Sequence, residues 1–261
     1  MLKQSFREYF IERIKGKSFL IITAIYLALL FGSAVYWVID FDLRNLFMSL
    51  GFMLFVLAVF VVEYLLKFRA GSIFISAIYF LAYTSILGSC FNFYTIMPFL
   101  DLIQHCLSGV IFACLGVTFA NVFFGNNNTH KRFFGCLLFG VFFSLAIATL
   151  WEIFEYGVNT ILGFDMMEDA FVTQINSYLL AGTHNSAVHL DNITQTVVHY
   201  GNGKTYVFSG YLDLGLIDTL GDMMICTIGA IVFAIVSIIS HFKAPSINRA
   251  LIPQLIKKET E

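Results

Sequence analysis

Residues 133–155 read FFGCLLFGVFFSLAIATLWEIFE, and this stretch decides the fold class. Residues 133–151 carry no charge, and a helix needs about 20 apolar residues to cross the hydrocarbon core of a bilayer. The whole chain has the same character, because 59% of its 261 residues are hydrophobic and only 12% are charged. This composition excludes an ordinary soluble globular domain and predicts a membrane protein.

Five further stretches are long and apolar enough to cross a bilayer. The predicted fold class is therefore all-α, a polytopic membrane helical bundle of about six transmembrane helices. The other five predicted spans lie at 18–38, 46–66, 71–90, 101–124 and 215–240.

Basic residues predict the orientation of these spans. Short cytoplasmic loops collect Lys and Arg, and only Arg44 and Lys204 of the 15 basic residues fall on the opposite side of a six-span chain. We therefore expect a multi-pass protein of the plasma membrane with both termini in the cytoplasm. Trp37 and Trp151 then lie at the outer interface, where aromatic residues are enriched.

The predicted membrane domain covers residues 18–241. Residues 1–17 place apolar side chains at helical spacing among basic ones, which predicts an amphipathic helix on the inner face. Residues 242–261 are predicted to be a cytoplasmic tail. Residues 157–214 form the one sizeable segment expected outside the bilayer, an extracytoplasmic insertion between spans five and six.

Within the insertion, Thr196–Phe208 alternates around the turn residues 201–203. This pattern predicts a β-hairpin. His184, His189 and His199 are separated by five and ten residues, which match no metal-ligand interval, so we expect surface histidines.

Three pairs of ionisable residues decide where a functional site is expected. Each pair is spaced three or four residues apart, so its members share one face of a helix. Each also lies near the outer end of the fourth, fifth or sixth span. Titratable groups near hydrocarbon are expensive, so we expect all six to converge on one site. The pairs are Asp101 with His105, Glu152 with Glu155, and Asp218 with Asp222.

Small residues extend each of these faces into the membrane. They let transmembrane helices approach closely, so the polar faces are predicted to point into helix contacts. The residues are Gly109, Ala113, Gly116 and Ala120 on the fourth span, Gly140, Ser144 and Ala148 on the fifth, and, less completely, Gly229 on the sixth.

Two further features have a structural interpretation. Glu63 lies near the inner end of the second span, four residues before Lys67, and is predicted to form a helical ion pair with it. The five cysteines are scattered singly through apolar segments and are expected to be small buried hydrophobes without disulfides.

The runs DLIQHCLSG at 101–109, WEIFEY at 151–156 and DTLGDM at 218–223 resemble the bacterial YjdF-like family of multispan inner-membrane proteins. A more remote likeness is to VanZ-like proteins. The resemblance covers about residues 100–235 and implies that the three motifs act as one unit. It transfers no reaction, and the VanZ-like likeness implies only a place in the cell envelope. The hairpin around Gly201 looks like an insertion between the second and third motifs.

Five carboxylates and one imidazole in a small volume need neutralisation by a bound cation or by protons. Oxygen-rich ligands suit Mg²⁺, Mn²⁺ or Ca²⁺, and Zn²⁺ if His105 ligates. One hypothesis is a metal-dependent hydrolase or transferase that acts on an envelope lipid or a lipid-linked precursor. His105, oriented by Asp101, would then be the general base. The predicted metal ligands are Glu152, Glu155, Asp218 and Asp222.

Two non-enzymatic interpretations stay open. The cluster could bind cations or protons in a transporter, although the inner halves of spans four to six carry no matching acids. It could instead be a structural polar clasp between helices. Membrane lipids are the expected partners. Nucleic acid is not, because the net charge is -2 and no basic face is predicted. No G-x-x-x-x-G-K-[ST] motif for direct use of ATP occurs.

Overall fold

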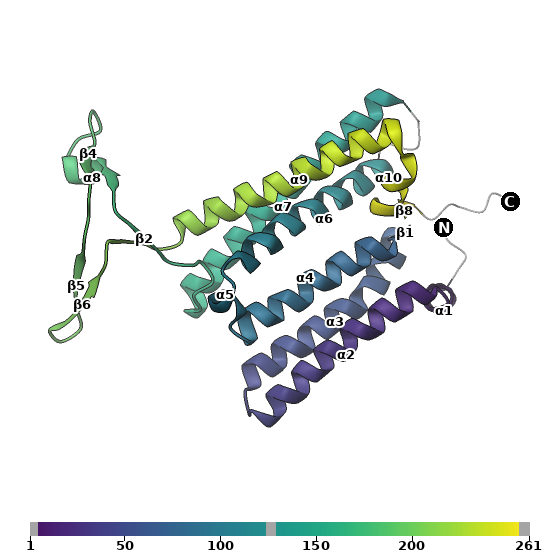
Figure 1. Ribbon diagram of the computed structural model, residues 1–261, viewed down its shortest axis with the longest axis horizontal. Coiled ribbons are helices and arrows are strands. Elements are labelled where there is room, and N and C mark those ends of the chain that lie inside the picture. The colour runs from purple at the N-terminus through teal and green to yellow at the C-terminus, as the bar shows by residue number, and fades with distance from the viewer. Residues whose placement is uncertain (1–4, 124–128, 256–261) are drawn as a thin grey trace. The chain divides into compact units, whose positions relative to one another are not determined.

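The computed structural model describes residues 5–123 and 129–255, and its helices confirm the predicted fold class (Figure 1). Among these residues, six helices are long and apolar enough to cross a membrane, so the protein is a polytopic helical membrane protein. They are α2 (Lys17–Ile39), α3 (Leu43–Leu66), α4 (Ser72–Cys90), α6 (Phe99–Phe123), α7 (His130–Leu162) and α9 (Leu216–Lys243).

The chain divides into two compact units. The first comprises the described residues up to Ala148 and from Met224 onward, and the second is Thr149–Met223. Within the first unit, α4 packs against both α2 and α6 (Figure 1). The short helix α5 (Phe93–Ile96) leads into α6.

Glycines bring α6, α7 and α9 into direct backbone contact within the first unit. A methyl group added at Gly109 would lie 2.0 Å from the carbonyl oxygen of Cys226, and one at Gly229 would lie 2.0 Å from that of Cys106. At Gly116, the added methyl would lie 2.7 Å from the Cα of Gly140. The predicted small-residue faces therefore do form close helix contacts.

The amphipathic helix α1 (Phe6–Ile14) is anchored to the protein by Glu63. A capping box starts the helix, in which Ser5 and Glu8 exchange hydrogen bonds, and these bonds lower the pKa of the Glu8 carboxyl. Arg13 then binds Glu63 through Nε–Oε2 at 2.8 Å and Nη2–Oε1 at 2.9 Å. The Tyr9 hydroxyl donates to the same carboxylate. Burial, followed by this hydrogen bond, raises the pKa of Tyr9 well above its usual range.

The predicted ion pair between Glu63 and Lys67 is therefore wrong. Glu63 is fully buried, and its Oε1 also accepts a hydrogen bond from the backbone N–H of Ala70 at 2.7 Å. Lys67 ends α3 in a left-handed conformation with φ 56° and is exposed. The Lys67 backbone N–H still donates to the Glu63 carbonyl oxygen, but the Glu63 carboxylate is bound by Arg13 and Ala70 instead of by the Lys67 side chain.

Arg13 of α1 and the last described residues both contact the connection between α3 and α4. Arg13 donates to the carbonyl oxygen of Ala70 at 2.8 Å. From the other end, β8 (Gln254–Leu255) pairs antiparallel with β1 (Phe68–Arg69). The helix α10 (Pro245–Leu251) precedes β8. Part of the predicted C-terminal tail is thus folded against the membrane domain.

The second unit contains three two-stranded antiparallel sheets and the short helix α8 (Tyr178–Ala181). The helix α7 ends at Leu162, before Gly163 with φ 69°, so it continues six residues into the segment predicted as an insertion. The predicted hairpin is confirmed, with Gly201 and Gly203 at positive φ in its turn. The paired strands are β2 (Ala170–Val172) with β7 (Tyr211–Asp213), β3 (Ile175–Ser177) with β4 (Val188–Leu190), and β5 (Thr196–Tyr200) with β6 (Lys204–Phe208).

The histidines of the insertion are surface residues, as predicted. His184, His189 and His199 are all exposed. His189 pairs with Asp191 at 2.9 Å, and the ring of His199 lies 3.2 Å from the Thr205 hydroxyl. These contacts give two of the three a local structural role.

Candidate functional site

Three buried carboxylates meet at the end of α7 and the start of α9, within the second unit. Glu152 and Glu155 lie three residues apart, so they share one face of α7, and Asp222 comes from the second turn of α9. The side chains offer oxygen atoms that all lie within 4.8 Å of one another. Their exposed fractions are only 5%, 8% and 4%. The structure therefore brings Glu152, Glu155 and Asp222 together as an acidic group.

Trp151 orients one member of this acidic group. Its indole Nε1–H donates to Oε1 of Glu155 at 2.8 Å, across one turn of α7. This hydrogen bond fixes the position of the Glu155 carboxylate on α7. Sequence reasoning assigned Trp151 only to the interface. Its spacing of four residues from Glu155 was the signal that could have revealed the hydrogen bond.

Asp218 lies outside the acidic group. Its Oδ2 accepts a hydrogen bond at 3.0 Å from the backbone N–H of Glu168 in the insertion. Asp213 acts nearby, because its Oδ2 accepts from the backbone N–H of Ile217 at 2.9 Å in the first turn of α9. Close to this helix start, desolvation raises the pKa of Asp169, and the charges of Asp165 and Asp213 raise it further. Asp218 is thus held by the base of the insertion.

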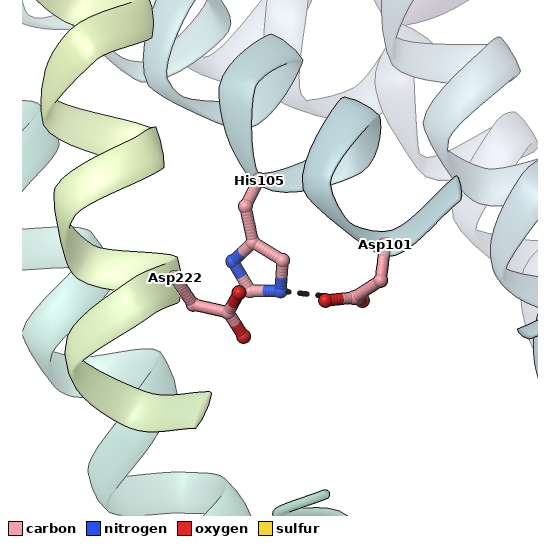
Figure 2. Close-up of side chains that lie close together, drawn as sticks. All are labelled: Asp101, His105 and Asp222. Carbon is pink, nitrogen blue, oxygen red and sulfur yellow. Dashed lines mark ion pairs between the residues drawn. The ribbon is translucent and has the colours of Figure 1, made fainter. Parts of the chain in front are cut away.

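Asp101 and His105 form a pair on α6, in the first unit. Nε2 of His105 lies 3.5 Å from Oδ1 of Asp101 across one helical turn, and both side chains are mostly buried. Figure 2 shows this pair on α6 and also draws Asp222 on α9. A carboxylate beside one ring nitrogen selects the tautomer with the proton on that nitrogen. The arrangement is the one that a general base oriented by an acid requires.

Gln104 anchors α6 next to this pair. It is buried, and its Oε1 accepts hydrogen bonds from Ser85 of α4 at 3.1 Å and from Tyr94 of α5 at 3.2 Å. Polar side chains inside a membrane commonly hydrogen-bond across helix contacts. Sequence reasoning missed Gln104, although an uncharged polar residue between Asp101 and His105 in an apolar run was a usable signal. These two hydrogen bonds restrict rotation of α6 about its own axis.

The acidic group fits a divalent cation by distance and by chemistry. Mg²⁺ and Ca²⁺ take oxygen ligands at about 2.0–2.6 Å, so two ligand oxygens on opposite sides of one ion can be separated by at most about 5.2 Å. The observed limit of 4.8 Å lies within that span. Carboxylate oxygens are also the ligands that these hard cations prefer.

A family match covers all of these residues. Residues 19–243 match the family described as "Predicted membrane protein (DUF2238)". The chain belongs to this DUF2238 family. The match reaches from the third residue of α2 to the end of α9. It agrees with the resemblance to multispan membrane proteins, but it gives no support to the remote likeness to VanZ-like proteins. Comparison with curated proteins and with solved structures gave no match.

Proposed function

We propose that Glu152, Glu155 and Asp222 hold a divalent cation in a hydrolase or transferase that acts from the outer leaflet on a lipid or a lipid-linked envelope precursor. One observation carries this proposal. Three carboxylates buried to more than nine-tenths present oxygens within 4.8 Å of one another at the ends of two membrane helices. Oxygen ligands select Mg²⁺, Mn²⁺ or Ca²⁺. Zn²⁺ would require a nitrogen ligand such as His105.

The proposed reaction is metal-assisted attack of water or of an acceptor hydroxyl. The cation would polarise a phosphoryl or acyl oxygen of the substrate. With Nε2 of His105 turned toward Asp101, Nδ1 is the nitrogen that would accept the proton of the attacking group. The developing imidazolium would be stabilised by the Asp101 carboxylate. Asp101 is therefore a positioning residue, and His105 is the proposed general base.

Transport is the second candidate function, and the contacts of Glu63 weigh against it. An ion or proton pathway across the membrane needs ionisable groups along its length. Glu63 is a fully buried acid near the predicted inner face, and Arg13, Tyr9 and Ala70 all bind its carboxylate. An acid so neutralised is poorly suited to accept a further cation. The third candidate, a structural clasp, requires no ligand at all.

The metal content of a charge-neutral variant separates cation binding from a purely structural clasp. We expect about one divalent cation per chain in the detergent-purified protein, and its loss in the double variant Glu152→Gln, Asp222→Asn, because neutral amides bind hard cations weakly. Elemental analysis measures the content, and circular dichroism confirms that the variant is folded. Asp191→Asn, an exposed carboxylate of the insertion, is the matched control and should keep the metal.

Asp218→Asn tests which carboxylates ligate. Since the backbone of Glu168 binds Asp218, this variant should retain most of the metal, whereas Glu152→Gln should lose it. Absence of metal from the native protein, together with unfolding of the double variant, would contradict the enzyme proposal and favour the clasp.

The proposed orientation has its own test. Cysteine placed at Asn202, in the hairpin turn, should react with a membrane-impermeant maleimide in intact cells, because the insertion is proposed to face outward. Cysteine at the exposed Lys15 should react only after the membrane is permeabilised. The opposite pattern would place the acidic group on the cytoplasmic side and exclude an outer-leaflet substrate.

A further inference from the structure

Two histidines face each other at the other ends of α7 and α9, within the first unit. Nδ1 of His130, the first residue of α7, lies 3.1 Å from Nε2 of His241, in the last turn of α9. These helix ends lie together in Figure 1. His130 and His241 belong to the first unit and the acidic group to the second, so the two sites share no residue.

Aromatic rings hold both imidazoles in place. The ring of His241 stacks on Phe133 of α7, with centroids 4.0 Å apart and planes 13° apart. In return, the ring of His130 stacks on Phe242 of α9, with centroids 5.8 Å apart and planes 24° apart. Each helix thus supplies one histidine and one phenylalanine to the other. Such reciprocal stacking restricts ring rotation and preorganises the two nitrogens.

The distance between the nitrogens suits a shared metal ion. Imidazole nitrogens bind Zn²⁺ at about 2.0–2.1 Å, so two of them are separated by roughly 2.9 Å at a right angle and roughly 3.4 Å at the tetrahedral angle. The observed 3.1 Å lies between these values. A hydrogen bond between neutral rings has a similar length, so distance alone does not choose between the two. A direct measurement of metal binding distinguishes a shared metal ion from a hydrogen bond between the rings.

We propose that His130 and His241 bind a divalent transition metal of the Zn²⁺, Ni²⁺ or Cu²⁺ class and so link the first turn of α7 to the last turn of α9. Imidazole nitrogens select these ions over Mg²⁺ and Ca²⁺. Solvent reaches the site because His130 is exposed, so water can complete the coordination. The neighbouring cations Lys131, Arg132 and Lys243 oppose a bound cation. The site should therefore bind with moderate affinity, without burying the ion.

Cu²⁺ is the probe that tests this site. The full chain, purified in detergent without a histidine tag, should bind one Cu²⁺ whose electron paramagnetic resonance spectrum shows coupling to two imidazole nitrogens. His130→Gln and His241→Gln should each lose one nitrogen coupling and weaken binding at least about tenfold, or about 1.4 kcal/mol. Zn²⁺ should compete for the same site only in excess, because nitrogen ligands bind Cu²⁺ more tightly than Zn²⁺. His184→Gln, in the exposed insertion, is the matched control and should change neither result.

The outcomes also separate this site from the acidic group. The double variant Glu152→Gln, Asp222→Asn should leave the nitrogen-coupled Cu²⁺ signal intact, because the acidic group contains no nitrogen ligand. If His241→Gln fails to fold, the variant His130→Gln still provides the test, because His130 is exposed and its replacement should leave the fold intact. A Cu²⁺ spectrum without nitrogen coupling, or equal affinity in native protein and His130→Gln, would overturn the proposal. Either result would establish a hydrogen-bonded histidine pair without metal.

Discussion

Replacing Glu63 with glutamine is expected to lower the free energy of unfolding by about 3–5 kcal/mol, the range measured when one partner of a buried ion pair is removed. Glu63 is fully buried, and its carboxylate accepts hydrogen bonds from Arg13, Tyr9 and Ala70. The amide of glutamine has one acceptor oxygen and carries no charge. The Arg13 guanidinium, which is 9% exposed, would keep its charge without a counter-ion. The loss is measured as a lower unfolding midpoint in detergent.

An exposed ion pair between the same chain segments provides the control. Arg69 and Glu12 approach to 2.8 Å, but their side chains are 40% and 51% exposed. Exposed pairs contribute at most about 1 kcal/mol, so Arg69→Gln should shift the midpoint little. A large effect of Glu63→Gln with a small effect of Arg69→Gln would show that burial of the charge decides the loss. Equal effects would contradict the anchoring of α1 by Glu63.

The second large effect is expected at the contact between α6 and α9. Gly109→Ala and Gly229→Ala should each destabilise the protein by about 1–3 kcal/mol, the range for overpacking a well-packed core. The added methyl group would lie 2.0 Å from the carbonyl oxygen of Cys226 or Cys106. Backbone atoms cannot rotate away as a side chain can, so the helices must separate. Unfolding midpoints of each variant measure the cost.

Two comparisons make the glycine test specific. Gly51→Ala in α3 meets no atom within 4 Å, and it should leave stability unchanged or raise it by up to about 1 kcal/mol through helix propensity. The double variant Gly109→Ala, Gly229→Ala should cost less than the sum of its parts, because one separation of α6 from α9 relieves both clashes. Additive costs would show that the two glycines act at independent contacts.

The candidate site shows how far helical spacing alone can predict a site. Spacing placed Glu152 and Glu155 on one face, and membrane topology placed Asp222 at the same level. Spacing also put Asp218 on the face of Asp222, yet the Asp218 carboxylate accepts a hydrogen bond from the backbone N–H of Glu168. The fold of the insertion decides that contact. No local pattern in α9 could predict a partner 50 residues earlier in the chain.

The partner of Glu63 shows the same limit. The local rule favoured Lys67 at i+4, but α3 ends at that residue in a left-handed conformation. The observed partner is Arg13, which lies 50 residues earlier in the chain. Only the docking of α1 against α3 determines that pair. The histidine pair is similar, because His130 and His241 lie 111 residues apart and no spacing rule relates them.

The sequence by itself determined the six membrane helices, the hairpin and the faces on which small and ionisable residues lie. These features depend on hydropathy, helical period and turn chemistry, which are properties of short segments, from a single turn up to one membrane-spanning helix. Only the tertiary structure decided which polar groups meet: Glu63 with Arg13, Glu152 with Asp222, and His130 with His241. A buried polar group must find a partner in a medium without water, and that partner is set by which helices are neighbours.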